Sequence, residues 1–199
     1  QYLCNGFNLA DAARLVYDDH YFKSGKKSFR FIRKKTEDRS DTEIVIPIIE
    51  PLQKILDEIA AKPEKGALVF PQIYAGETDE NKQKARISQE NQNIRKRLGR
   101  LVKSMGWEVA PSGTWCRHSF ATNLSHAGGV PKEYIQEAMG HSVMSGTVTD
   151  RYIQSYPIAQ QMQFNSKLLK VGDQVDIMEE LQGLTPDQIK ALIDMVKKK

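Results

Sequence analysis

Tyr152, His141 and Arg117 are side chains that together suit phosphoryl transfer without a metal ion. Such a reaction needs a nucleophile, cations beside the non-bridging phosphate oxygens and a proton donor for the leaving oxygen. A tyrosine hydroxyl can be the nucleophile, and a guanidinium binds a phosphate through two parallel hydrogen bonds. His141 follows Gly140, a glycine of the kind that ends helices, and a helix C-terminus favours the cationic form of a histidine. Each residue alone is common in structural roles, so only the combination indicates a site.

Lysine and arginine are concentrated in two segments of the chain. The first holds Lys23, Lys26, Lys27, Arg30, Arg33, Lys34 and Lys35, and the second holds Arg95, Lys96, Arg97, Arg100 and Lys103. A short exposed hairpin dense in these residues is well suited to binding phosphates, whereas the charges of a long helix are often only solvated. The net charge is +4, and acidic residues gather after position 174. This pattern favours double-stranded DNA as the partner.

The sequence gives no reason to expect a metal, a cofactor or a membrane anchor. Asp, Glu and His residues do not occur at the spacing of metal ligands, which disfavours a metal-dependent nuclease. The longest apolar runs, such as residues 44–49, are too short to cross a bilayer, and residues 1–7 do not form a signal peptide. Cys4 and Cys116 are both set among apolar residues, so we predict reduced, buried thiols in a cytoplasmic protein.

The apolar periodicity predicts a mainly α-helical protein with one small antiparallel β-sheet, an α+β fold. Asn8 and Asp11 have the spacing of a capping box that begins a helix, and Thr147 begins a short helix that carries Tyr152. Strand formers on either side of a polar stretch at residues 36–41 predict a hairpin. Further helices are predicted over residues 51–61, 81–105, 117–126, 130–140 and 158–169, with a final one that carries Ile189, Leu192, Ile193 and Val196.

Three segments around the candidate residues resemble the motifs of a known enzyme family. They are RHSFATNL at residues 117–124, AGGVPKEYIQEAMGHS at 127–142 and TVTDRYI at 147–153. Together they resemble the catalytic core of the tyrosine recombinases, the phage integrase family. NGFNLADAARL at residues 5–15 is similar to the family's first motif, and the predicted hairpin is similar to its β-hairpin. The likeness extends from Gln1 to Lys170 and implies the fold of the family's catalytic domain and its DNA strand exchange.

The resemblance implies a role for each candidate residue. Tyr152 would be the nucleophile that forms a 3′-phosphotyrosyl bond, and Arg117 the second of two activating arginines. His141 would donate a hydrogen bond to the phosphate. Lys35 would protonate the leaving 5′-oxygen, and its neighbour Lys34, the alternative, points to the opposite face of the strand. The other expected DNA contacts are Lys34, Lys27, Arg30, Asn8, Thr114 and His118, although His118 also suits a role in bracing its helix.

Two positions depart from the family's pattern. Asn8 stands where the family has its first arginine, and Thr114 stands where it has a histidine three residues before Arg117. Neither side chain supplies a positive charge, and the loss of one charge-assisted donor costs several kcal/mol of transition-state stabilisation. Arg33 shares a strand face with Lys35, so our hypothesis is that Arg33 supplies the missing cation in catalysis. Such variant motifs resemble integrases of mobile elements from Bacteroides-like bacteria.

Tyr156 is a second tyrosine close to the expected nucleophile. It lies four residues after Tyr152, and Pro157 follows it directly. A proline at that position predicts the end of a helix, which disfavours Tyr156 as the attacking residue.

The resemblance also predicts how the chain is organised. Residues 1–170 would form the catalytic domain, without the family's preceding core-binding domain, and residues 171–199 a linker and a helix. That helix would dock either on a neighbouring protomer or on its own domain. We expect a homotetramer on paired DNA sites, a monomer for the isolated domain, and a cytoplasmic location on the bacterial nucleoid. The alternatives are a DNA-binding relative that has lost cleavage and, as a weaker match, a type IB topoisomerase.

Overall fold

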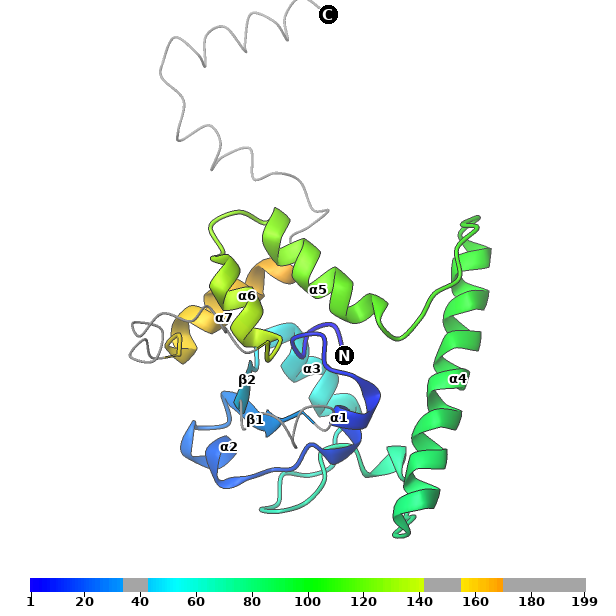
Figure 1. Ribbon diagram of the computed structural model, residues 1–199. Coiled ribbons are helices and arrows are strands. Elements are labelled where there is room, and N and C mark those ends of the chain that lie inside the picture. The colour runs from blue at the N-terminus through cyan, green and yellow to red at the C-terminus, as the bar shows by residue number, and fades with distance from the viewer. Residues whose placement is uncertain (34–42, 142–154, 170–199) are drawn as a thin grey trace, which may run out of the picture. The chain divides into compact units, whose positions relative to one another are not determined.

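The computed structural model describes residues 1–33, 43–141 and 155–169 of the 199-residue chain (Figure 1). The chain divides into two compact units, Gln1–Leu168 and Leu169–Lys199. Lys34 and Lys35, the predicted helix with Tyr152, and the predicted final helix all lie outside the described residues. The boundary at residue 170 between a catalytic domain and a tail stays a prediction. Within the described ranges, every helix is too short or too polar to span a membrane.

The first unit is mainly helical and has one two-stranded antiparallel sheet, as the sequence predicted. The six helices predicted within the described residues all occur, including the one begun by the capping box, with ends shifted by a few residues. The short helices α2 and η1 were not predicted. In chain order the elements are α1 (Leu9–Arg14), α2 (Asp19–Lys23), β1 (Ser28–Ile32), β2 (Glu43–Pro47), α3 (Glu50–Ile59), η1 (Pro71–Ile73), α4 (Glu80–Ser104), α5 (Trp115–His126), α6 (Lys132–Ala138), α7 (Ile158–Ser166) and η3 (Lys167–Leu169).

The sheet alternates apolar and polar residues, as a strand pair with one covered face requires. Phe29 lies opposite Ile46 and Phe31 opposite Ile44 in the register. Phe29, Ile44 and Ile46 are buried, whereas Arg30 on the other face is partly exposed. The hairpin is therefore held in place by its apolar face.

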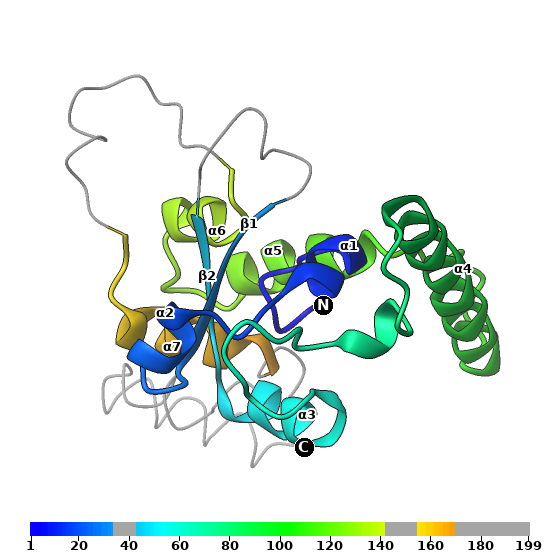
Figure 2. The same cartoon turned by 90° about the horizontal axis from the view of Figure 1, so that it is seen from below.

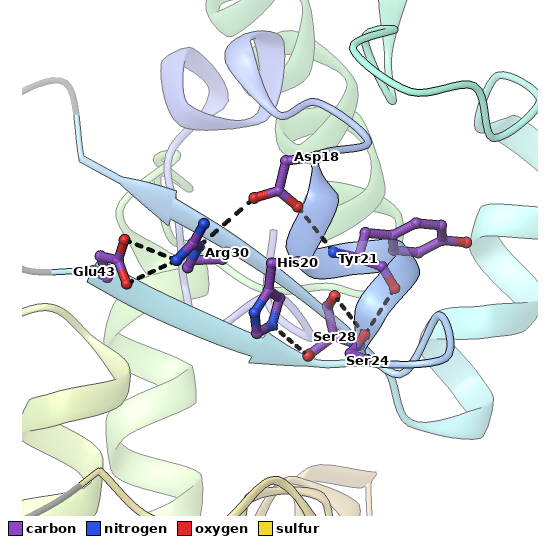
Figure 3. A network of polar contacts seen from close by, with 7 residues as sticks. All are labelled: Asp18, His20, Tyr21, Ser24, Ser28, Arg30 and Glu43. Atoms are coloured by element: carbon purple, nitrogen blue, oxygen red, sulfur yellow. Dashed lines mark hydrogen bonds and ion pairs between the residues drawn. The ribbon is translucent and has the colours of Figure 1, made fainter.

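The short helix α2 fastens the start of the hairpin. Asp18 caps the helix through the backbone N–H of Tyr21 at 2.9 Å, and its carboxylate also pairs with Arg30 at 3.6 Å (Figure 3). His20 Nε2 lies 2.8 Å from Ser28 Oγ, which joins the helix to β1. The ring of Tyr21 stacks on Phe29 with centroids 5.0 Å apart, a contact worth about 1 kcal/mol beyond burial.

Helices α5, α6 and α7 supply the core on the side of β2. Phe120 and Leu124 of α5 and Tyr134 of α6 are fully buried, and α6 and α7 both contact β2 (Figures 1 and 2). Helix α4 is different, because Val102 is the one residue of its 25 that is buried. It contacts α1 and η1, while its basic residues from Arg95 to Lys103 are exposed.

Candidate active site

Arg117 and His141 meet at the centre of the candidate site. Arg117 lies in the first turn of α5, and His141 follows the end of α6. The Arg117 Nη2 atom donates to the Met139 carbonyl at 2.7 Å and lies 2.8 Å from Nε2 of His141. The structure thus brings together two predicted site residues that are 24 positions apart in the sequence.

The backbone of Gly6 packs directly against Arg117. Its φ of +65° is in the left-handed region, and a Cβ there would lie 2.6 Å from the Arg117 Cα. A real Cβ essentially never comes so close, so this position suits glycine alone. Asn5 beside it also has a positive φ, +54°. The backbone of the tight turn before α1 therefore packs against the Cα, Cβ and Cγ atoms of Arg117 and limits where this side chain can lie.

A buried chain of amides holds that turn. Asn5 donates to the Val45 carbonyl at 2.9 Å and accepts from Asn165 at 2.8 Å. Asn165 in turn accepts from the Tyr134 hydroxyl at 2.7 Å. Burial raises the pKa of Tyr134, so its hydroxyl stays a donor throughout the working pH range. The network ties β2, α6 and α7 to the turn that contacts Arg117, and each partner is satisfied, as buried polar groups require.

Gly140 fixes the position of His141. The residue ends α6 with φ +64°, and its N–H donates to the Glu137 carbonyl at 2.8 Å. The N–H of His141 donates to the Gln136 carbonyl at 3.0 Å, which closes the helix end in the usual glycine-dependent manner. A Cβ on Gly140 would collide with Ile44 of β2 and lie 3.4 Å from Cδ of Arg33. His141 therefore follows a turn that is packed against the hairpin (Figure 2).

Arg33 extends from the end of β1 toward a buried carboxylate. Its Nε lies 3.7 Å from Oδ2 of Asp11, with side-chain exposures of 12% for Arg33 and 0% for Asp11. Asp11 belongs to the predicted capping box, in which Asn8 Oδ1 accepts from the Asp11 N–H at 2.8 Å. The sequence indicated Asp11 only as a cap residue, and its place beside the cations could not be seen from local spacing.

The site has more positive than negative charge. Burial and the neighbouring charge of Arg33 lower the pKa of Arg117 to about 10, while Asp11 acts in the opposite direction. Arg33 pairs with Asp11, and the charge of the same carboxylate also acts on Arg117, so two guanidinium groups have one carboxylate between them and an excess positive charge remains in a partly desolvated place. Such an arrangement attracts an anion, and a phosphodiester has the matching single charge.

His141 corrects one expectation from the sequence. The helix end was predicted to favour the imidazolium form, yet burial and the charges of Arg117 and Arg33 lower the pKa of His141. Desolvation and two nearby cations outweigh the partial charge of a single helix terminus. In the free protein His141 is therefore more readily neutral than an exposed histidine.

The predicted DNA contacts among the described residues differ in how they are engaged. Lys27 is exposed, whereas the Arg30 guanidinium lies 3.1 Å from Glu43 in addition to its pairing with Asp18. Thr114 precedes α5 and hydrogen-bonds through its hydroxyl to Ser112 at 2.7 Å. His118 lines a shallow cavity of about 380 Å³ with Trp115, Ser119, Thr122 and Asn123.

Tyr156 packs into the core rather than standing beside the site. Its ring meets Tyr134 edge-on at 5.4 Å and Phe164 at 5.7 Å. Ser155, Tyr156 and Pro157 lie outside any helix, and Pro157 is the N-cap of α7. The helix predicted to end before Pro157 lies outside the described residues, so its end stays a prediction. The fixed φ of Pro157 suits the start of a helix as well as its end.

The cysteines and the acidic residues do not form a metal centre in the described ranges. Residues 1–33, 43–141 and 155–169 contain no group of three or more His, Cys, Asp or Glu side chains placed to hold an ion. Both cysteines are free thiols; Cys4 is buried, which raises its pKa to about 11, and Cys116 is partly exposed.

Comparison with known proteins identifies the family. The chain matches the family model of the phage integrases over residues 5–157, so it belongs to the phage integrase family. The matched range includes Arg33, Arg117, His141 and Tyr152. Curated proteins and solved structures give no match. Membership of this family points to site-specific recombination and to DNA as the partner.

Proposed function

We propose that this chain is the catalytic domain of a tyrosine recombinase that cuts and rejoins DNA through a 3′-phosphotyrosyl intermediate. The observation that carries the proposal is the contact between Arg117 and His141 beside Arg33, a partly buried cationic site. The family match over residues 5–157 supplies the reaction class. The proposed chemistry follows from bringing Tyr152 to a phosphate bound in this site.

In the proposed reaction the Tyr152 hydroxyl loses its proton to solvent as its oxygen attacks the scissile phosphorus, and the bond to the 5′-oxygen breaks. Arg117 and His141 bind the non-bridging oxygens, on which charge grows in the transition state. Lys35 gives a proton to the leaving 5′-oxygen, with Lys34 as the alternative donor. In the second step a 5′-hydroxyl from the partner strand attacks the phosphotyrosine and releases Tyr152, so the phosphodiester bonds are exchanged without an external energy source.

Arg33 is our candidate for the cation missing at Asn8. Asn8 stands where the family has its first arginine, and its side chain caps α1 instead of supplying a cation. Arg33 is mostly buried, and its charge influences the pKa of both Arg117 and His141. The variants Arg33→Ala, Lys35→Ala and Arg117→Ala test this substitution. If Arg33→Ala keeps full cleavage while the other two lose it, Arg33 does not replace the missing arginine.

The second candidate is a DNA-binding relative without cleavage. Asn8 and Thr114 favour it, since neither can stabilise a phosphorane by charge and both are engaged in local hydrogen bonds. Arg117 and His141 favour an active enzyme, because a site released from selection would rarely keep two such groups in contact. We therefore prefer the active recombinase, of the variant type carried by Bacteroides-like mobile elements.

The proposed assembly is a homotetramer on two DNA sites in the bacterial cytoplasm. Lys27, Arg30, Asn8, Thr114 and His118 are proposed to face DNA, and residues 171–199 to link protomers or to fold back. Arg30 has the weakest support, since Asp18 and Glu43 already surround its guanidinium.

The decisive experiment uses full-length protein and a nicked suicide substrate from the ends of its element. An adduct that survives denaturant and is absent from Tyr152→Phe would establish the tyrosine chemistry. Clear DNA binding without an adduct in either protein would favour the binding module instead. Tyr156→Phe is the matched control, and it should form the adduct as the unaltered protein does.

A further inference from the structure

The hydrogen bonds of Arg117 define the protonation state of His141. A guanidinium nitrogen such as Nη2 carries two hydrogens and cannot accept a hydrogen bond. One of them points to the Met139 carbonyl at 2.7 Å, and the other to His141 Nε2 at 2.8 Å. Nε2 must then be the acceptor, so in the free protein His141 is neutral and carries its proton on Nδ1.

The charged groups around His141 explain why it is neutral. Arg117 faces it from α5 and Arg33 from the end of β1, and both lower the pKa of His141. Asp11 of α1 offsets this charge only in part, because it is shared between the two arginines. On α6, the Glu137 carboxylate accepts hydrogen bonds from Ser155 and Tyr156. In the free protein the charges of Arg117 and Arg33 therefore outweigh that of Asp11 and lower the pKa of His141.

A bound phosphodiester reverses this balance. Its negative charge offsets the excess positive charge of Arg33 and Arg117, and its oxygens compete for the guanidinium hydrogens. Once Arg117 turns to the phosphate, Nε2 faces an acceptor and makes a favourable contact only if it carries a proton. An anion beside a histidine also favours the imidazolium form.

We propose that His141 takes up one proton from solvent when a DNA phosphodiester binds beside Arg117, so that Nε2 changes from acceptor to donor. The assignment of the ligand rests on the proposed function. The step adds one proton to one nitrogen and breaks no other covalent bond. Binding and protonation are thereby coupled, and each favours the other.

The coupling has a defined effect on affinity. DNA affinity rises as the pH falls through the interval between the free and the bound pKa of His141, by up to tenfold per pH unit. At pH values above the bound pKa or below the free pKa of His141, protonation of His141 no longer changes the DNA affinity with pH. His141→Gln removes the dependence, whereas His126→Gln, at the exposed end of α5 and outside the proposed DNA contacts, leaves it in place.

Nuclear magnetic resonance of the full chain labelled with ¹⁵N-histidine tests the proposal directly. The chain has four histidines, so His141→Gln assigns the signal by its loss. The Tyr152→Phe background prevents any adduct. The spectrum is followed over pH for the free protein, with dimethyl phosphate, which stays a monoanion throughout, and with a duplex oligonucleotide.

The expected result is a proton on Nδ1 in the free protein and a raised pKa of His141 with either ligand. A proton on Nε2 in the free protein, or a titration unchanged by both ligands, would overturn the proposal. Because adduct formation is not the readout, a recombinase whose His141 does not respond keeps the proposed function and loses only this coupling. If the pKa of His141 rises with the ligands but the unaltered protein never forms an adduct, the coupling is kept and the proposed recombinase function is lost.

Discussion

The backbone of Gly6 lies directly against Arg117, so closely that a methyl group on Gly6 would come within 2.6 Å of the Arg117 Cα. The contact joins the turn before α1 to the helix that carries the candidate arginine, 111 positions later in the sequence. The position of the guanidinium therefore depends on a residue that has no side chain.

Gly6→Ala is expected to destabilise the protein and to reduce adduct formation. The left-handed φ costs about 1–2 kcal/mol for a non-glycine residue, and the overlap with Arg117 adds about 1–3 kcal/mol. Gly66→Ala is the matched control, since Gly66 has φ +82° and open space around it. Denaturant unfolding should show a larger loss for Gly6→Ala, and equal losses would mean that the contact with Arg117 is not tight.

Gly140→Ala should displace His141 from Arg117. The added methyl group meets Ile44 of β2, so either the hairpin or the end of α6 must move. Gly128→Ala has a similar φ of +69° and no atom within 4 Å, which isolates the strain of the backbone alone. We expect the pKa of His141 to rise toward its ordinary value in Gly140→Ala only, as followed by nuclear magnetic resonance. An unchanged pKa in that variant would show that the turn adapts without moving the histidine.

Tyr134→Phe should cost about 1–3 kcal/mol of unfolding free energy. The change removes the donor to Asn165 and leaves a buried amide oxygen without its hydrogen bond. Tyr156→Phe keeps the ring contacts with Tyr134 and Phe164, so its stability should remain within about 0.5 kcal/mol of the unaltered protein. A comparison of denaturation midpoints measures both, and equal midpoints would rule out a strong hydrogen bond at Asn165.

The pH dependence of stability should show the signature of a histidine with a lowered pKa. Its unfolded value is the ordinary one, about 6.5, and the folded value lies below it. As the pH falls below the unfolded value, the unfolded chain binds a proton more readily, so this contribution disfavours the folded state. The decline should be smaller in His141→Gln than in the unaltered protein, as measured by unfolding between about pH 7 and pH 5. An identical decline would mean that Arg117 and Arg33 do not act on His141.

Local patterns in the sequence were sufficient for most elements of the first unit. The capping box at Asn8 and Asp11 and the alternation around Phe29 and Phe31 each depend on neighbours within a few residues. The helix α2 was missed because its five residues are too few to show a period. Periodicity needs more than one turn to be recognised.

The candidate site was harder to predict, because its geometry depends on long-range contacts. The residue types of Arg117 and His141 were identified from motifs, but their hydrogen bond joins two helices. Asn5 and Asn165 bond across 160 positions, and no sequence pattern marks such a pair. The lowered pKa of His141 could not be predicted for the same reason: the helix-end rule is local, whereas the two arginines reach the imidazole from elsewhere in the fold.

Helix α4 buries little of its surface, so sequence changes on its basic face are separate from changes at the candidate site. The α4 basic residues Arg95, Lys96, Arg97, Arg100 and Lys103 are exposed to solvent, so substitutions there leave the packing behind Arg117 intact. Most surface substitutions of this kind alter stability by less than about 0.5 kcal/mol. On the proposed function, a lineage can therefore vary the basic helix to suit new DNA while the chemistry of the site is inherited unchanged.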